Sequence, residues 1–110
     1  MGMEQDNCGM HFGAFKNDIL AGVVSLFNSK TIFQFRKLAV EPLQQNIGIG
    51  SSLLNYIINY AIENGGTKIW CNARLPATGF YLKIGFTKTG DLFLKNGFDY
   101  EIMEKKLPGI

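Results

Sequence analysis

Histidine, cysteine and long apolar runs are all scarce in this chain of 110 residues. The one histidine, His11, and the two cysteines, Cys8 and Cys71, do not have the spacing of a metal site, so no bound metal is expected. The apolar runs are too short to cross a bilayer, which predicts no membrane partner. Residues 1–7 are polar and contain no signal-peptide core, so we expect a cytoplasmic protein.

An excess of charge of one sign is also missing. The 11 basic and 9 acidic residues give a formal net charge of +2, and the basic residues form no stripe that would bind DNA or RNA. The 3 prolines and 13 glycines are scattered, and no linker or repeat separates parts of the chain. A hydrophobic content of 46% is enough for one globular domain, which we expect to span residues 1–110.

The chain does contain two closely spaced glycines between a strand-like and a helical segment. Residues 33–40 resemble a strand, and apolar residues recur at helical spacing from Leu53 to Ala61. Gly48 and Gly50 therefore lie where the helix begins, where the first N–H groups have no partner within the helix and the dipole favours an anion. A pyrophosphate would suit this position. The alternative is that the two glycines only form a tight turn.

Two common nucleotide-binding loops do not fit this segment. A dinucleotide-binding turn needs a third glycine at the position of Leu53 and an acidic residue roughly 20 positions later, where residues 69–71 are Ile, Trp and Cys. A nucleotide-triphosphate loop needs lysine directly after a glycine, but Ile49 and Ser51 follow the two glycines.

The segment resembles the acyl-coenzyme A loop of the GNAT N-acetyltransferase superfamily, whose pattern is Gln or Arg, two residues, Gly, one residue, then Gly or Ala. Gln45, Gly48 and Gly50 occupy these positions. Upstream, residues 38–42 resemble the strand end and proline that precede this loop in the family. Downstream, residues 77–86 resemble the family's Phe-Tyr helix, which closes on Gly-Phe. The resemblance covers residues 33–107.

Periodicity and turn residues predict six strands and two helices. The strands are expected at residues 10–15, 19–27, 32–40, 68–72, 86–95 and 98–107, and the helices at 49–63 and 76–84. The first three strands form an antiparallel meander, and the helix between residues 40 and 68 makes a right-handed crossover between parallel strands. This is an α/β (α+β) fold with a mixed, mostly antiparallel sheet. The resemblance adds that the parallel central strands splay apart, as in acyl-coenzyme A N-acyltransferases.

The resemblance also implies that acetyl-coenzyme A is the co-substrate. The residues that it places at the cofactor are Leu38, Ala39, Val40, Gln45, Asn46, Ile47, Gly48, Ile49, Gly50, Ser51, Asn72 and Arg74. The first three would bind the pantetheine arm through their main chain, although core packing is an alternative role for their side chains. Arg74 could reach a phosphate with its planar guanidinium or lie in solvent, and Asn72 could contact the cofactor or cap a turn.

Tyr81 is the residue that the resemblance assigns to catalysis, as the donor of a proton to the departing coenzyme A thiolate. A tyrosine pKa near ~10 suits this role because the phenol keeps its proton at neutral pH. The alternative is a half-buried aromatic side chain packed beside Phe80. No carboxylate occurs between residues 32 and 40, so Glu41 is the nearest candidate base; it could equally be a solvated loop residue, with ordered water accepting the proton.

GNAT proteins usually begin with a strand and one or two helices that form a wall of the acceptor site, whereas the first strand expected here begins at residue 10. We therefore expect a small member that lacks these elements and covers the exposed sheet edge as a homodimer. The expected activity is transfer of acetyl to a primary amine of a small molecule or peptide by direct attack. The alternatives are a non-catalytic acyl-coenzyme A-binding or regulatory module and a protein-interaction module.

Overall fold

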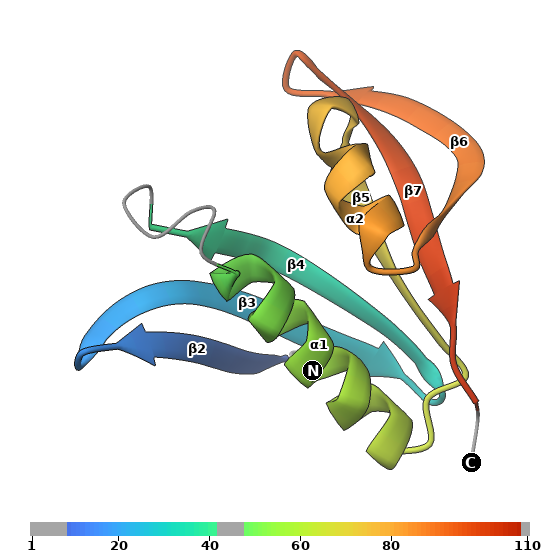
Figure 1. Ribbon diagram of the computed structural model, residues 1–110. Coiled ribbons are helices and arrows are strands. Elements are labelled where there is room, and N and C mark those ends of the chain that lie inside the picture. Colours follow the sequence, from blue (N-terminus) through green and yellow to red (C-terminus); the bar gives the residue numbers. More distant parts are fainter. Residues whose placement is uncertain (1–8, 42–47, 109–110) are drawn as a thin grey trace, which may run out of the picture.

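The computed structural model describes residues 9–41 and 48–108 (Figure 1). This part of the chain forms six strands and two α-helices. They are β2 (Met10–Lys16), β3 (Ile19–Ser29), β4 (Ile32–Val40), α1 (Ile49–Glu63), β5 (Lys68–Arg74), α2 (Thr78–Lys83), β6 (Thr87–Lys95) and β7 (Phe98–Lys106). The expected second helix is divided, because a short 3-10 helix, η2 (Leu75–Ala77), holds Pro76 and precedes α2.

The described strands form one sheet in the order β2-β3-β4-β5-β7-β6. Only β4 and β5 are parallel, and α1 connects them, while the other neighbouring strands are antiparallel. The predicted mixed and mostly antiparallel sheet is therefore confirmed.

Residues with left-handed backbone form two tight hairpin turns. Asn17 and Asp18, with φ of 53° and 65°, connect β2 to β3, and Asn96 and Gly97, with φ of 52° and 80°, connect β6 to β7. Positive φ at both central residues matches the right-handed twist of the flanking strands, and Asn, Asp and Gly tolerate it best. These turns join the strands that the sequence predicted at residues 10–15 and 19–27 and at residues 86–95 and 98–107.

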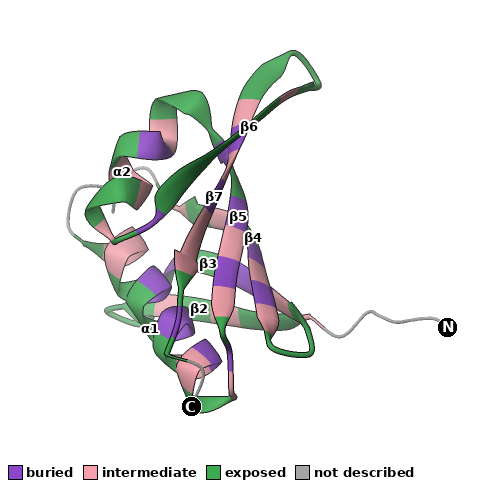
Figure 2. Ribbon diagram, turned by 90° about the vertical axis from the view of Figure 1, so that its right-hand side faces the viewer, coloured by how far each residue is buried: buried purple, intermediate pink, exposed green. Residues whose placement is uncertain are grey.

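Both α-helices cover the same face of the sheet, and no described helix covers the other face (Figure 2). The buried side of α1 consists of the five apolar residues predicted from their spacing: Leu53, Leu54, Ile57, Ile58 and Ala61. They pack against buried strand residues, among them Leu26, Phe33 and Ile69. Neither described helix has the length and hydropathy required to cross a bilayer.

Candidate active site

The two parallel strands of the sheet are paired at one end only. β4 pairs with β5 over Ile32–Gln34 against Lys68–Trp70, and no further pair joins them. Beyond this point β4 continues beside β3, and β5 continues beside β7, so that the central strands diverge (Figure 1). The predicted splay of the central strands is thus present in the structure.

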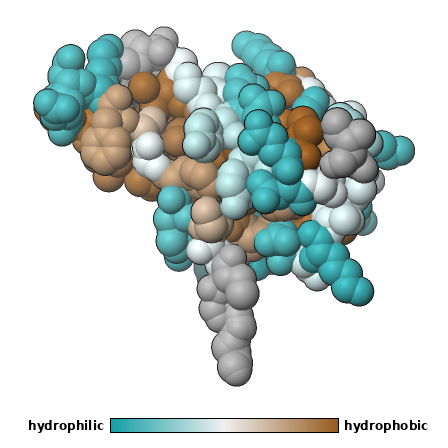
Figure 3. Space-filling model, turned by 90° about the horizontal axis from the view of Figure 1, so that it is seen from below, coloured by the Kyte–Doolittle hydropathy of each residue, from teal (hydrophilic) through white to brown (hydrophobic). Residues whose placement is uncertain are grey.

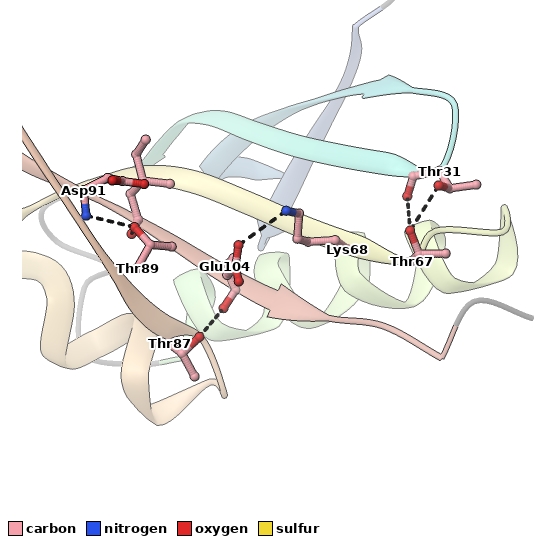
Figure 4. Close-up of polar contacts among 8 residues, drawn as sticks. Thr31, Thr67, Lys68, Thr87, Thr89, Asp91 and Glu104 are labelled. Atoms are coloured by element: carbon pink, nitrogen blue, oxygen red, sulfur yellow. Dashed lines mark hydrogen bonds and ion pairs between the residues drawn. The ribbon is translucent and has the colours of Figure 1, made fainter.

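Polar side chains connect the paired end of these strands to each other and to their neighbours (Figure 4). The Thr67 hydroxyl lies 3.0 Å from that of Thr31, and the Thr67 N–H donates to the Thr31 carbonyl at 2.8 Å. The ammonium of Lys68 lies 3.4 Å from a carboxylate oxygen of Glu104 on β7. These contacts hold the starts of β4 and β5 together, which leaves the opening at their carboxyl ends.

The separating part of β4 contains a bulge. Its register with β3 passes from Ser25 opposite Arg36 to Val23 opposite Ala39, so β4 has one more residue than β3 in this interval. Lys37 lies within the bulge and has a φ of 58°. A bulge changes the direction of the backbone, here in the part of β4 that β5 has left.

A groove of about 590 Å³ lies on the helix-covered side of this opening. The carboxyl end of β4, the start of α1, the end of η2 and the outer part of α2 contribute the lining residues: Leu38, Val40, Gly48, Ile49, Gly50, Ser51, Ala77, Phe80 and Lys83. The first turn of α1 has no acidic residue, so its unpaired N–H groups and dipole remain favourable to an anion. The groove can therefore accept an elongated ligand with a negatively charged end.

Gly50 allows three elements of the groove to approach one another closely. A Cβ atom at this position would lie 3.3 Å from Cζ of Phe80 on α2 and 3.6 Å from Cγ2 of Val40 on β4. Gly48 differs, because its φ of 87° requires glycine while the space around its Cα is open. The left-handed backbone at Gly48 is compatible with both expectations for these glycines, a tight turn and a bound anion.

The groove brings together only some of the residues expected at the cofactor. Leu38, Val40, Gly48, Ile49, Gly50 and Ser51 line it, and Gln45, Asn46 and Ile47 lie outside the described residues. Ala39 instead borders a separate cavity of about 310 Å³. Asn72 and Arg74 do not line the groove, and their side chains are exposed on β5.

Lys83 is a groove residue that sequence reasoning missed. Among the described residues that line the groove it is the only positively charged side chain, and it lies in the last turn of α2. Its spacing of three residues from Phe80 places both on one face of the helix, and this spacing was the signal available in the sequence.

Tyr81 lies where β4 and β5 begin to separate. Its ring is 5.7 Å from that of Phe35, the residue after the last paired position of β4, and it also contacts Phe80 and Phe86 at centroid distances of 5.2 and 6.0 Å. Burial raises the pKa of Tyr81 to about 12, and the charge of the Cys71 thiolate contributes to the increase. The phenol is therefore protonated at neutral pH.

A family model for the GNAT acetyltransferase domain matches residues 2–107 of this chain. An uncharacterized N-acetyltransferase of Bacillus subtilis, YitI, is 27% identical over 90 residues, which are 76% of this chain and 60% of YitI. The chain thus spans less than two thirds of the length of this curated relative.

Solved structures of acetyltransferases have the same fold. The ribosomal-protein-S18-alanine N-acetyltransferase of Escherichia coli superposes with a TM-score of 0.82 at 20% identity, over 94% of this chain and 72% of the other. A GNAT family acetyltransferase of Elizabethkingia anophelis with acetyl-coenzyme A bound gives a TM-score of 0.77 at 24% identity, over 90% and 76%.

Proposed function

Because the chain belongs to the GNAT acetyltransferase family, we propose that it transfers an acetyl group from acetyl-coenzyme A to a primary amine. The observation that carries this proposal is the position of Tyr81 at the separation of β4 and β5, with the groove between β4, α1 and α2 on the same side of the sheet. A protonated phenol can donate to the departing thiolate, and the start of α1 can bind the pyrophosphate of the same co-substrate.

In the proposed complex, the pyrophosphate lies at the start of α1, against the loop that includes Gln45, Asn46 and Ile47 and against Gly48 to Ser51. Lys83 provides a positive charge at the other wall of the groove. The pantetheine arm follows the carboxyl half of β4, from Leu38 to Val40, where β5 no longer accompanies the strand. An amide-containing chain can pair with such an edge as an added strand would.

In the proposed reaction, the amine nitrogen attacks the thioester carbonyl carbon, a C–N bond forms and the C–S bond breaks. Tyr81 donates its proton to the departing sulfur and is reprotonated from solvent, while the amine loses a proton to ordered water or to Glu41. Burial raises the pKa of Tyr81 to about 12, so the phenol keeps its proton until negative charge develops on the departing sulfur.

The first test is thermal melting with acetyl-coenzyme A. A ligand that binds only the folded chain adds about 2.7 kcal/mol of stability at a hundredfold excess over Kd. We expect a clear rise in melting temperature, together with release of coenzyme A thiol when a panel of amines is added. Stabilisation without thiol release would favour the alternative function, a non-catalytic acyl-coenzyme A-binding or regulatory module.

Replacing Gly50 with valine tests the position of the cofactor. The added side chain would fill the space between α1, α2 and the ligand, so we expect a large loss of coenzyme A affinity. Gly79→Ala on α2 is the matched control, because a Cβ there meets nothing within 4 Å. The contrary outcome is a Gly50→Val protein with a much lower melting temperature whose folded fraction binds coenzyme A with unchanged affinity. Gly50 would then be a packing residue, and the pyrophosphate assignment would be wrong.

Three further expectations from the sequence remain proposals. We propose that residues 1–110 form a single acetyltransferase-like domain, that the acceptor is a small-molecule or peptide amine, and that the protein forms a homodimer. The cytoplasmic location stays a prediction from the sequence.

A further inference from the structure

The helix that carries Tyr81, α2, has only six residues, Thr78–Lys83. An isolated helix shorter than about 12 residues is marginal in water, so contacts at the two ends of α2 have to hold it in place. At its start the buried Thr78 hydroxyl donates to the Leu75 carbonyl at 3.0 Å, which joins α2 to η2. The position of the Tyr81 phenol therefore also depends on how the other end of α2 is held.

The end of α2 is closed by a Schellman motif that includes Tyr81. The Phe86 N–H donates to the Tyr81 carbonyl at 3.1 Å, and the Gly85 N–H donates to the Leu82 carbonyl at 3.1 Å. Gly85 has the left-handed backbone that this motif uses, with a φ of 103°. The Phe86 ring is buried and contacts the Tyr81 ring at a centroid distance of 6.0 Å. Both the main chain and the ring of Tyr81 thus contact the residues that follow α2.

Lys105 of β7 lies directly against this motif. Its Nζ atom is 2.5 Å from the position that a Cβ atom would take at Gly85, and its Cε and Cδ atoms are 3.6 and 3.8 Å from the same position. The end of the lysine side chain thus occupies the space that glycine leaves open. Lys105 reaches this place because it is paired with the buried Ile69 on β5 and projects from the same face of the sheet.

The charge of Lys105 suits the end of a helix. A cation is favourable there, because the last carbonyl groups of the helix have no partner within it and the dipole is negative at this end. Within the described residues no carboxylate pairs with Lys105, and the ion pair that involves β7 joins Lys68 to Glu104. Lys105 does not line the groove, where the positive charge is that of Lys83. Its ammonium is therefore available to stabilise the end of α2.

We propose that Lys105 is a positioning residue for the acetyl transfer: it stabilises the Schellman motif at the end of α2 and so holds the Tyr81 phenol where it can protonate the departing thiolate. This inference rests on the proposed function, because it assigns a support to the general acid of that reaction. Lys105 touches neither the co-substrate nor the reacting atoms and acts only through Tyr81. Loss of its charge should therefore slow the chemical step and leave the binding of acetyl-coenzyme A unchanged.

The test removes the charge of Lys105 but keeps the length of its side chain. With the full chain and the amine that reacts fastest, Lys105→Met should lower kcat for thiol release by about tenfold or more, because a misplacement of about 1 Å can cost about 100-fold. KM for acetyl-coenzyme A should change little. Lys105→Arg restores the charge and should recover part of the loss. Lys106→Met, at the next and exposed residue of β7, is the matched control and should keep the wild-type kcat. Thermal melting shows that each variant is folded at the assay temperature.

A double variant separates positioning from other effects. If Lys105 acts only through the phenol, adding Lys105→Met to Tyr81→Phe should cause no further loss of kcat. Ultraviolet titration of tyrosinate gives a second readout that needs no acceptor, with the corresponding Tyr81→Phe protein subtracted in each case to isolate Tyr81. Burial raises the pKa of Tyr81 to about 12 in the wild type, and a less firmly held α2 in Lys105→Met should bring this pKa back toward 10.0.

Unchanged kcat in Lys105→Met, an equal loss in Lys106→Met, or a full additional loss in the double variant would each overturn the inference and leave the proposed function standing. A rise in KM for acetyl-coenzyme A without a fall in kcat would also overturn it, because Lys105 would then support binding. If no amine reacts, the titration decides, and the same pKa of Tyr81 with and without Lys105 overturns the inference. Failure of the wild-type protein to bind acetyl-coenzyme A would contradict the proposed function, and the inference with it.

Discussion

At the scale of single residues, Tyr81 links the core to the proposed chemistry. Its ring packs among Phe35, Phe80 and Phe86, so Tyr81→Phe should preserve stability and cofactor affinity. If the phenol protonates the leaving thiolate, the same change should lower kcat by about 10²- to 10⁴-fold. Steady-state assays of thiol release measure this, and undiminished kcat would reduce Tyr81 to a wall of the site.

The buried thiol and phenol also predict how stability depends on pH. Cys71 and Tyr81 ionise near 9.0 and 10.0 without the fold, and burial raises both pKa values to about 12 in the folded chain. Below about pH 8 both groups are almost entirely protonated in either state, so they cause almost no change there. Between about pH 9 and 12 the unfolded chain releases these protons first, and the free energy of unfolding falls.

Urea unfolding at intervals from pH 8 to 11 checks this expectation. Cys71→Ala and Tyr81→Phe should each make the alkaline fall less steep, whereas Tyr56→Phe, at an exposed tyrosine on α1, should leave it unchanged. A fall of the same steepness in all four proteins would show that other groups cause it.

The sequence predicted the part of the site that consecutive residues build. Gly48 to Ser51 form the start of α1, and the glycines and the apolar spacing that follows them lie next to each other in the sequence, so a local pattern was enough. The place of Arg74 on β5 was not predicted, because the strand was expected to end at Asn72 and its last two residues depend on pairing with β7. Lys83 was missed because its place in the groove depends on how α2 packs across the opening of the sheet.

At the scale of elements, α1 supplies much of the core. Ile57 is fully buried on its inner side, so Ile57→Ala should cost about 2 to 5 kcal/mol of unfolding free energy. Asn59→Ala, on the exposed side of the same helix, should change stability by no more than about 0.5 kcal/mol. Equal losses in urea unfolding would contradict the orientation of α1.

The ends of the helices and strands show which boundaries short sequence patterns predict and which they do not. The end of α1 was predicted from its residues: the Asn64 side chain donates to the Tyr60 carbonyl at 2.8 Å, and Gly65 has a φ of 79°. β5 extends to Arg74, beyond the predicted end at Asn72, because β7 pairs with its last residues. The bulge at Lys37 was not predicted, since it exists only relative to β3.

At the scale of the whole molecule, the outer edge of β2 is the proposed contact between two copies. Within the described residues β2 pairs only with β3, and large apolar side chains at this end of the sheet are exposed: Met10, Phe15, Ile19, Leu20 and Val23. Figure 3 shows apolar surface gathered over the β2–β3 end of the molecule. A second copy would cover both the strand edge and this surface.

Light scattering at tens of micromolar should therefore give the mass of a dimer. Phe15→Asp should shift the protein to monomer, whereas Leu94→Asp, at an equally exposed residue on β6, should not. A monomeric wild-type protein would contradict the homodimer.

The short pairing of β4 with β5 has a consequence for how the chain could be divided. Residues 10–41 and 48–63 build one side of the opening and residues 68–106 build the other, so the described chain passes between the two sides once, at Gly65 and Gly66. Each side contributes one wall of the groove, α1 from the first and α2 from the second. If the chain is cut between these glycines, the two fragments should therefore associate with a lower Kd when coenzyme A is present, because the co-substrate binds to both walls of the groove at once.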